Sequence, residues 1–319
     1  MRQIQRVFWC ALMLAFAAWC VQAFRLDLAQ LSLSPILRSW DVVLLATFFS
    51  LLNYAARAVR WQSYLARLGH RMSVGFAALT YTAGFAFTLS PGKVGEMTRA
   101  RYYAPLGIPV ADVAAAFFIE RLMDLLAMLV LALLILTISD RYSIAIWGAA
   151  ALIATALALL AALPWPAVAQ ALQASTRVPR TLRASLIGAA VTLAAARVLL
   201  RPGTLLFGFA IGLAAWGLEG LGLGLLGSLF PPVHLDFVAG LGIYAVAVLI
   251  GALSFLPGGL GSTEAVMTAL LVTQGFTFPQ ALLITIVCRV VTLWFAVGVG
   301  WGAIYALRRQ APAVVAPWQ

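Results

Sequence analysis

Two interrupted apolar stretches decide the fold of this chain. They are Leu89-Ser90-Pro91-Gly92-Lys93-Val94-Gly95-Glu96 and Leu256-Pro257-Gly258-Gly259-Leu260-Gly261-Ser262-Thr263-Glu264. The first stretch follows the apolar run 74–89, and the second separates the apolar runs 236–255 and 260–274. Proline and glycine end or kink a helix, so each stretch predicts two short helical segments joined by unwound backbone.

The composition around these stretches is that of a membrane protein. Of the 319 residues, 64% are hydrophobic and 10% are charged, and the mean hydropathy is +1.01. A soluble domain carries about 25% charged and about 45–50% apolar residues. These values exclude a soluble enzyme, a secreted disulfide scaffold and a disordered regulator. At about 20 residues per span, the length accommodates six to nine helices.

We predict an all-α polytopic membrane protein that forms a single transmembrane domain over 1–319. It has about six full transmembrane helices and two re-entrant broken-helix hairpins. The predicted full spans are 7–24, 41–57, 110–138, 143–163, 203–230 and 279–306. The first span also resembles a cleavable signal peptide, and we interpret it as a retained transmembrane helix.

The segment 167–201 differs from the predicted spans because arginines are spread among its apolar residues. This pattern favours amphipathic helices that lie on the membrane face. In the alternative interpretation, 184–200 crosses the bilayer as a short helix with arginine at both ends.

The basic residues set the predicted orientation. The net charge is +11, and the arginines lie between the apolar segments, which favours the positive-inside rule over nucleic-acid binding. With the N-terminus inside and both hairpins re-entrant, thirteen arginines fall in inside loops and three in outside loops. The inside set is Arg2, Arg6, Arg57, Arg60, Arg67, Arg71, Arg177, Arg180, Arg183, Arg197, Arg201, Arg308 and Arg309; the outside set is Arg25, Arg38 and Arg141. Both termini are therefore predicted to be cytoplasmic.

Matching spacings indicate an internal duplication. Gly107 and Gly275, Glu96 and Glu264, and Arg121 and Arg289 are each separated by 168 residues. Repeat A covers about 72–138 and repeat B about 236–306. The predicted topology brings them in from opposite faces, as in the inverted repeats of secondary transporters, whose interrupted segments mark the binding site.

Ionisable side chains within the apolar segments are the candidate site residues. Each costs about 2.5–3.5 kcal/mol at mid-membrane, so each is expected to face a cavity or a partner. They are Glu96, Glu120, Arg121, Asp124, Glu219, Glu264 and Arg289. We hypothesise that Arg121 and Arg289 line a central cavity and hold a lipid phosphate, balanced by Glu96 and Glu264. The alternative is that these pairs only fix helix packing.

The loops add further candidates. Freed backbone N–H groups around Gly92, Gly258 and Gly259 can hold an anion. Lys93 either contacts a headgroup or is a plain inside-facing positive charge, and Glu120 and Asp124 share a helix face with Arg121. Glu219 either carries a proton or pairs with an arginine.

Several features are absent or ambiguous. No enzyme signature and no metal-ligand spacing is found, so we predict no catalytic residues, metal or cofactor. The pairs Gly208/Gly212 and Gly220/Gly224 have the spacing that lets helices approach closely, either in a homo-oligomer or inside one chain.

Four ordered motifs carry a family resemblance. They are Arg57-Ala58-Val59-Arg60-Trp61, residues 89–96, Phe118-Ile119-Glu120-Arg121-Leu122-Met123-Asp124, and residues 256–264. Together they resemble the lysylphosphatidylglycerol synthase transmembrane-region family over nearly the whole chain. The resemblance implies the lipid flippase activity of that family's membrane region. It also implies a stand-alone member, similar to the hopanoid-associated branch, because no soluble aminoacyltransferase domain is present.

The leading hypothesis is a transporter of the bacterial inner membrane that moves an anionic or polar-headed lipid between leaflets. Its partners are membrane lipids. The alternative is a membrane accessory protein or enzyme that presents a hopanoid, polyprenyl-linked lipid or phospholipid to a separate lipid-synthesis enzyme. The lipid, the direction of transport and the coupling ion stay open.

Overall fold

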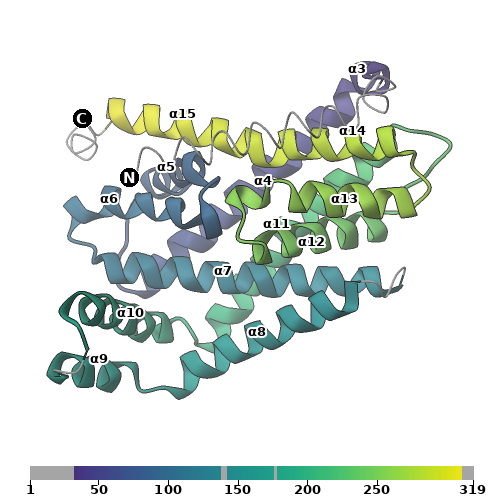
Figure 1. Cartoon of the computed structure of the whole chain (residues 1–319). Coiled ribbons are helices and arrows are strands. Elements are labelled where there is room, and N and C mark those ends of the chain that lie inside the picture. Colours follow the sequence, from purple (N-terminus) through teal and green to yellow (C-terminus); the bar gives the residue numbers. More distant parts are fainter. Residues whose placement is uncertain (1–31, 138–141, 176–177, 311–319) are drawn as a thin grey trace, which may run out of the picture.

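The computed structural model describes residues 32–137, 142–175 and 178–310, and all regular structure in these ranges is helical (Figure 1). This confirms the predicted all-α polytopic membrane protein. Four of the described helices are long and apolar enough to cross a membrane: Trp40–Arg67, Ser143–Ala162, Pro202–Gly227 and Phe278–Arg309. The predicted span 7–24 lies outside the described residues, and the number of spans stays a prediction.

Five long helical units form the bundle. They are α4 (Trp40–Arg67), α7 (Val110–Ala132), α8 (Ser143–Ala162), α11 (Pro202–Gly227), and the continuous series α14 (Phe278–Arg289), η7 (Val290–Trp294) and α15 (Phe295–Gln310). The 3₁₀ turn η4 (Leu133–Thr137) extends α7 toward the predicted end at 138. The short helix α3 (Ser34–Arg38) precedes α4. These boundaries follow the predicted spans closely, with one exception.

The exception is α4, which continues ten residues beyond its predicted end at position 57. No proline or glycine interrupts the chain between Trp40 and Gly69, where a φ of 96° ends the helix. Arg57 and Arg60 therefore lie inside α4 and are buried, so their placement in an inside loop was wrong. The number of arginines in the predicted inside loops falls from thirteen to eleven, against three in the outside loops. The excess of arginine on the inside remains, so the predicted orientation does not change.

The two interrupted stretches form hairpins at opposite ends of the bundle (Figure 1). The first hairpin contains α5 (Val74–Ala83), η1 (Gly84–Phe87), η2 (Pro91–Arg99), α6 (Ala100–Tyr103) and η3 (Ala104–Leu106). The second contains α12 (Phe237–Leu253), η6 (Pro257–Gly259) and α13 (Ser262–Thr273). The loop turns η2 and η6 contact each other, so the unwound backbone of the two halves meets inside the protein.

Each half also packs its long helix against the hairpin of the other half. Helix α7, which follows the first hairpin, contacts α12, and α15, which follows the second, contacts α5 and η1. The inverted repeat itself stays a prediction. Whether the hairpins are re-entrant depends on the position of the bilayer and stays a prediction.

The segment predicted to lie on the membrane face forms α9 (Trp165–Ala174) and α10 (Arg180–Val198), which pack on each other. Helix α10 also contacts α7 and α8. Neither helix is among the four described candidate spans. The structure therefore forms two helices in the segment where amphipathic helices were predicted, and their position relative to the bilayer stays a prediction.

The glycines of α11 serve contacts inside this chain. Gly208 and Gly212 face α4, where an added Cβ would meet Tyr64 and Arg60. Gly220 and Gly224 face α12, where Gly240 lies against them. Close packing inside one chain therefore accounts for both glycine pairs, and they supply no argument for a dimer.

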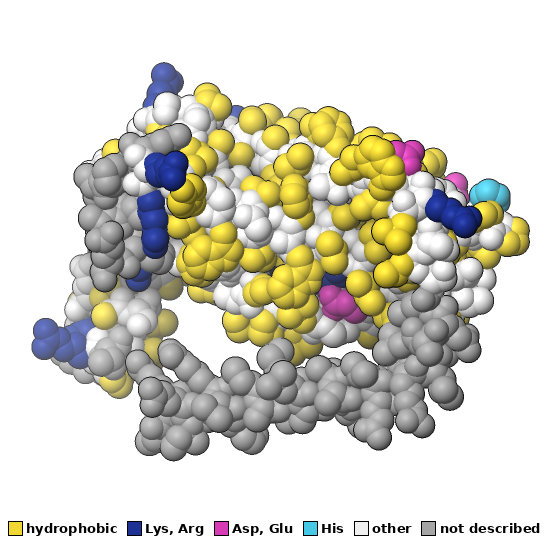
Figure 2. Space-filling view, turned by 90° about the horizontal axis from the view of Figure 1, so that it is seen from above, with side chains coloured by type: hydrophobic (Ala, Val, Ile, Leu, Met, Phe, Trp, Pro, Cys, Tyr) yellow, Lys and Arg dark blue, Asp and Glu magenta, His cyan; other side chains and the backbone are white. Residues whose placement is uncertain are grey.

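The face of the protein seen in Figure 2 is mainly apolar. In Figure 2, which looks down on α14 and α15, hydrophobic side chains cover the centre and several Lys and Arg side chains gather at one end. Exposed apolar side chains of these helices include Ile286, Val290, Trp294, Trp301 and Tyr305. Lipid tails are the environment in which such a belt is stable.

We predict that Gly220→Ala destabilises the bundle, whereas Gly217→Ala on the same helix does not. A Cβ added to Gly220 would lie 2.7 Å from Leu241 Cα, which is too close. A Cβ added to Gly217 would lie 3.9 Å from Leu241 Cδ2, which is an ordinary van der Waals distance. Both variants gain the same helix propensity, so Gly220→Ala should be less stable by about 1–3 kcal/mol, the cost of overpacking. Thermal unfolding of the purified protein in detergent measures the difference. Equal midpoints would contradict the close approach of α11 and α12.

Candidate functional site

The two loop turns share an unusual backbone conformation. Gly92 and Lys93 have φ values of 58° and 57°, and the equivalent Gly258 and Gly259 have 61° and 68°. These left-handed conformations suit glycine but cost a residue with a side chain about 1–2 kcal/mol. The two loops thus share one backbone shape, and the first loop accepts strain to place a lysine in it. Strain of this kind collects at functional sites.

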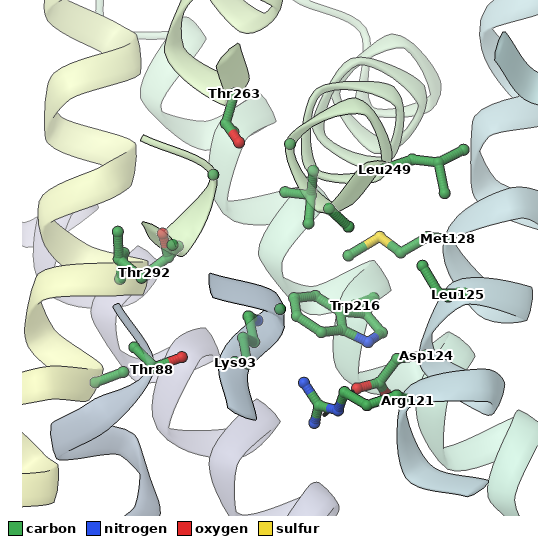
Figure 3. A pocket seen from close by; sticks show the side chains of 18 of the residues that line it. Thr88, Lys93, Arg121, Asp124, Leu125, Met128, Trp216, Leu249, Thr263 and Thr292 are labelled. Carbon is green, nitrogen blue, oxygen red and sulfur yellow. Dashed lines mark ion pairs between the residues drawn. The ribbon is translucent and has the colours of Figure 1, made fainter. Parts of the chain in front are cut away.

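A cavity of about 290 Å³ lies where the two loops meet (Figure 3). Its apolar lining includes Leu125 and Met128 of α7 and Leu249 of α12. Its charged lining residues are Arg57, Lys93, Glu96, Arg121, Asp124, Glu219 and Arg289. Four cations therefore face three anions, a net charge of +1 on the cavity wall. A mostly apolar pocket with a few convergent charged groups is the usual form of a small-ligand site.

Arginines from α4 surround the acids of α7. The Asp124 carboxylate accepts a hydrogen bond from Arg60 and lies 3.6 Å from Arg57 Nη2. Glu120 Oε1 lies 3.5 Å from Arg57 Nη2, and Arg121 Nη2 lies 3.1 Å from both acids. Glu120 and Asp124 are buried, and these ion pairs offset part of the cost of their charges.

The first loop joins the same network through Glu96. Arg99 Nη2 donates to Glu96 Oε2 over 2.7 Å, and Thr88 Oγ1 donates to Glu96 Oε1 over 2.9 Å. Arg99 Nη1 lies 3.5 Å from Glu120 Oε2, and Arg121 Nη2 lies 3.9 Å from Glu96. The cluster of Arg57, Arg60, Glu96, Arg99, Glu120, Arg121 and Asp124 therefore ties α4, η2 and α7 together.

Three members of this cluster were not predicted as site residues from the sequence. Arg57 and Arg60 were assigned to a loop, and Arg99 was not singled out as a partner of Glu96. The uninterrupted helical pattern from Trp40 to Arg67 would have placed Arg57 and Arg60 inside the membrane segment. At a spacing of three residues, Arg99 and Glu96 were close enough to pair.

The second half has a simpler charge pair. Arg289 Nε donates to Glu264 Oε1 over 2.6 Å, and Arg289 Nη2 donates to the Gly258 carbonyl over 2.7 Å. Glu264 also accepts from the Gly261 N–H. Arg289 thus holds both the unwound turn and the start of α13. The positions related by 168 residues, Glu96 with Arg121 and Glu264 with Arg289, each form a pair in space.

Lys93 is the cation of the wall that has no acid partner. Within the described ranges, no carboxylate lies within 4 Å of its Nζ, which lies 5.5 Å from the centre of the Trp216 ring. Arg57 lies 5.0 Å from the same ring. Figure 3 shows Lys93 and Trp216 side by side at the cavity. The aromatic face offsets part of the cost of two nearby cations and leaves the ammonium group available.

The predicted site residues therefore separate into two groups. Gly92, Lys93, Glu96, Arg121, Asp124, Glu219, Gly258, Gly259 and Arg289 all line the cavity. Glu120 and Glu264 lie outside the lining and support it through Arg121 and Arg289. No group of three His, Cys, Asp or Glu side chains in the described part of the chain is arranged for a metal ion.

Comparison with known proteins assigns the family. The family model described as "Lysylphosphatidylglycerol synthase TM region" matches residues 6–300. A curated protein named "UPF0104 membrane protein" from Methanothermobacter thermautotrophicus is 37% identical over 92 residues, which cover 29% of this chain. The match spans 27% of that protein's own length. The chain belongs to the lysylphosphatidylglycerol synthase TM region family, as its motifs indicated.

We predict that Arg60→Gln destabilises the protein strongly and that Arg71→Gln does not. Arg60 is fully buried between Asp124 and Glu120, so its loss leaves buried negative charge without full compensation. Breaking such a pair costs about 3–5 kcal/mol. Arg71 is exposed, and its replacement should change the free energy of unfolding by less than about 0.5 kcal/mol. Thermal unfolding in detergent compares the two, and similar midpoints would show that the cluster is not needed for stability.

Proposed function

We propose that this multi-pass membrane protein moves a lipid with an anionic headgroup between the leaflets of the bacterial inner membrane. The headgroup enters the cavity between the two halves, and the lipid is not altered covalently. The observation that carries the proposal is the wall charge of four cations against three anions, with Lys93 unmatched at the strained turn. A single negative charge on a headgroup would neutralise this wall.

The ion pairs that the other cations form support a headgroup role for Lys93. Arg57, Arg60 and Arg99 are buried and bound to acids, as the alternative of pure helix packing requires. Lys93 forms no such ion pair with a described acid, and its ammonium group faces the cavity. Arg121 also lines the cavity but is shared among three acids. We therefore propose Lys93 as the main headgroup contact and Arg121 as its neighbour.

The size and the rim of the cavity support a lipid as the ligand. About 290 Å³ is at the lower limit of small-molecule sites, enough for a phosphate-type headgroup but not for acyl chains. The lining includes Leu152, Phe255 and Leu256, which are also exposed at the surface. Tails could lie along this apolar rim while the headgroup occupies the charged interior. Exposed hydrophobic residues at this rim would be poor contacts for a fully water-soluble ligand.

The proposal is tested with the full chain in liposomes that carry headgroup-labelled phosphatidylglycerol or phosphatidylcholine. A membrane-impermeant quencher reports how fast the label changes leaflet. Protein-dependent movement of the anionic lipid is the expected result. If neither lipid moves and the purified protein changes the mass of a lipid, the chain is an enzyme instead. If it neither moves nor changes lipids, the proposal fails.

We predict that Lys93→Gly keeps or raises stability but weakens binding of phosphatidylglycerol by at least about tenfold. Glycine adopts the φ of 57° without the side-chain penalty, and the loss of one headgroup contact of about 1.4 kcal/mol is a factor of ten. Thermal unfolding and binding of labelled phosphatidylglycerol are measured on one preparation. Lys93→Arg keeps the charge and should retain most of the binding. Full binding by Lys93→Gly would exclude Lys93 as the headgroup contact.

A further inference from the structure

Glu219 is the one acid of the cavity wall that has no basic partner. It lies on α11, is 3% exposed, and accepts a hydrogen bond from Ser50 Oγ of α4 over 2.9 Å. Among the described residues, no basic group lies within 4 Å of its carboxylate, whereas Glu96 and Asp124 on the same wall are each paired with at least two arginines. An ionised carboxylate in such a position is expensive, and proton uptake relieves the cost.

The groups around Glu219 come from every helix packed on α11. Helix α4 contributes Tyr54 and Arg57, α7 contributes Arg121 and Asp124, α12 contributes Tyr244, and α14 contributes Cys288 and Arg289. The turn η2 contributes Lys93. The cations of this set already serve other groups: Arg57 and Arg121 bind the acids of α7, and Arg289 binds Glu264. Lys93 is the exception, and in the proposed function it contacts the headgroup.

We propose that Glu219 is a protonation site coupled to headgroup binding, and that Glu96 and Glu264 are not. This inference rests on the proposed function for its coupling step. A bound anion on Lys93 withdraws the nearest free positive charge from Glu219 and favours its neutral, protonated form. Conversely, protonation of Glu219 leaves four cations against two anions on the wall, and the net charge rises from +1 to +2. Proton and anion therefore support each other's binding, as reciprocal linkage requires.

A proton is a better occupant of this position than a metal ion. Hard cations take six or more oxygen ligands, while Glu219 is joined by one described hydroxyl donor, that of Ser50. Arg57, Lys93 and Arg289 line the same cavity and would repel an inorganic cation. A proton needs only the carboxylate, and Ser50 can turn its hydroxyl group to suit either form.

The first test detects the proton without any anionic lipid. Infrared difference spectra of the full chain in phosphatidylcholine, between about pH 5 and pH 9, report the C=O stretch of a protonated carboxylic acid. We expect a titrating band that is lost in Glu219→Gln and kept in Asp41→Asn, which replaces an exposed acid at the start of α4. A band that survives in Glu219→Gln, or no band at all, overturns the assignment.

The second test measures the coupling. Phosphatidylglycerol is a phosphodiester whose charge is constant over this pH range, so a change of its affinity reports the protein. We expect binding to weaken by about 5- to 150-fold as the pH rises, because Glu219 loses its proton and the wall charge falls. Both chains are compared in the Lys93→Arg background, where the headgroup contact keeps its charge at every pH, and there Glu219→Gln should bind with the high affinity throughout. A pH dependence that Glu219→Gln retains would overturn the coupling. If phosphatidylglycerol binds at no pH while the Glu219 band titrates, the lipid proposal fails and the proton site stands.

Discussion

Compensation of buried charge around Glu120 and Asp124 is the interaction on which the rest of the structure depends. Two carboxylates on adjacent turns of α7 would each cost several kcal/mol in an apolar interior without partners. The arginines that neutralise them come from α4, from η2 and from α7 itself. Each arginine therefore fixes where its element lies against α7. Because Glu96 is held in the same network, this charge balance also contributes to the position of the first unwound turn.

The second half is held by fewer charges. Arg289 ties the turn at Gly258 to Glu264, and an added Cβ on Gly259 would meet Thr263 Oγ1 at 2.6 Å and Gly251 at 3.2 Å. At the position equivalent to Lys93, the second half has Gly259, which fits only because it has no side chain. The duplicated turns thus share a backbone shape but differ in what they present to the cavity.

Much of the fold could be predicted from sequence because apolar length and interruption by proline and glycine are local signals. The ends of α7, α8 and α11 and both hairpins follow from them. The site was only partly predictable. The 168-residue spacing identified the pairs of Arg121 and Arg289, but nothing local distinguishes an Arg57 that is paired with acids from an Arg57 that is free. That distinction depends on the acids of α7, which are distant in sequence and meet α4 only in the folded chain.

The asymmetry between the halves bears on how such a cavity can release its ligand. If every cation of the wall were unmatched, an anionic headgroup would bind tightly and leave slowly. Here the arginines are already committed to acids, so a headgroup gains one free ammonium group and a wall charge of +1 rather than a cluster of bare cations. Weak net attraction of this kind suits transport, which requires binding that is favourable enough to enter and weak enough to leave. In the proposed function, the arginines paired with acids stabilise the cavity when it is empty, and the strained Lys93 supplies the selectivity for negative charge.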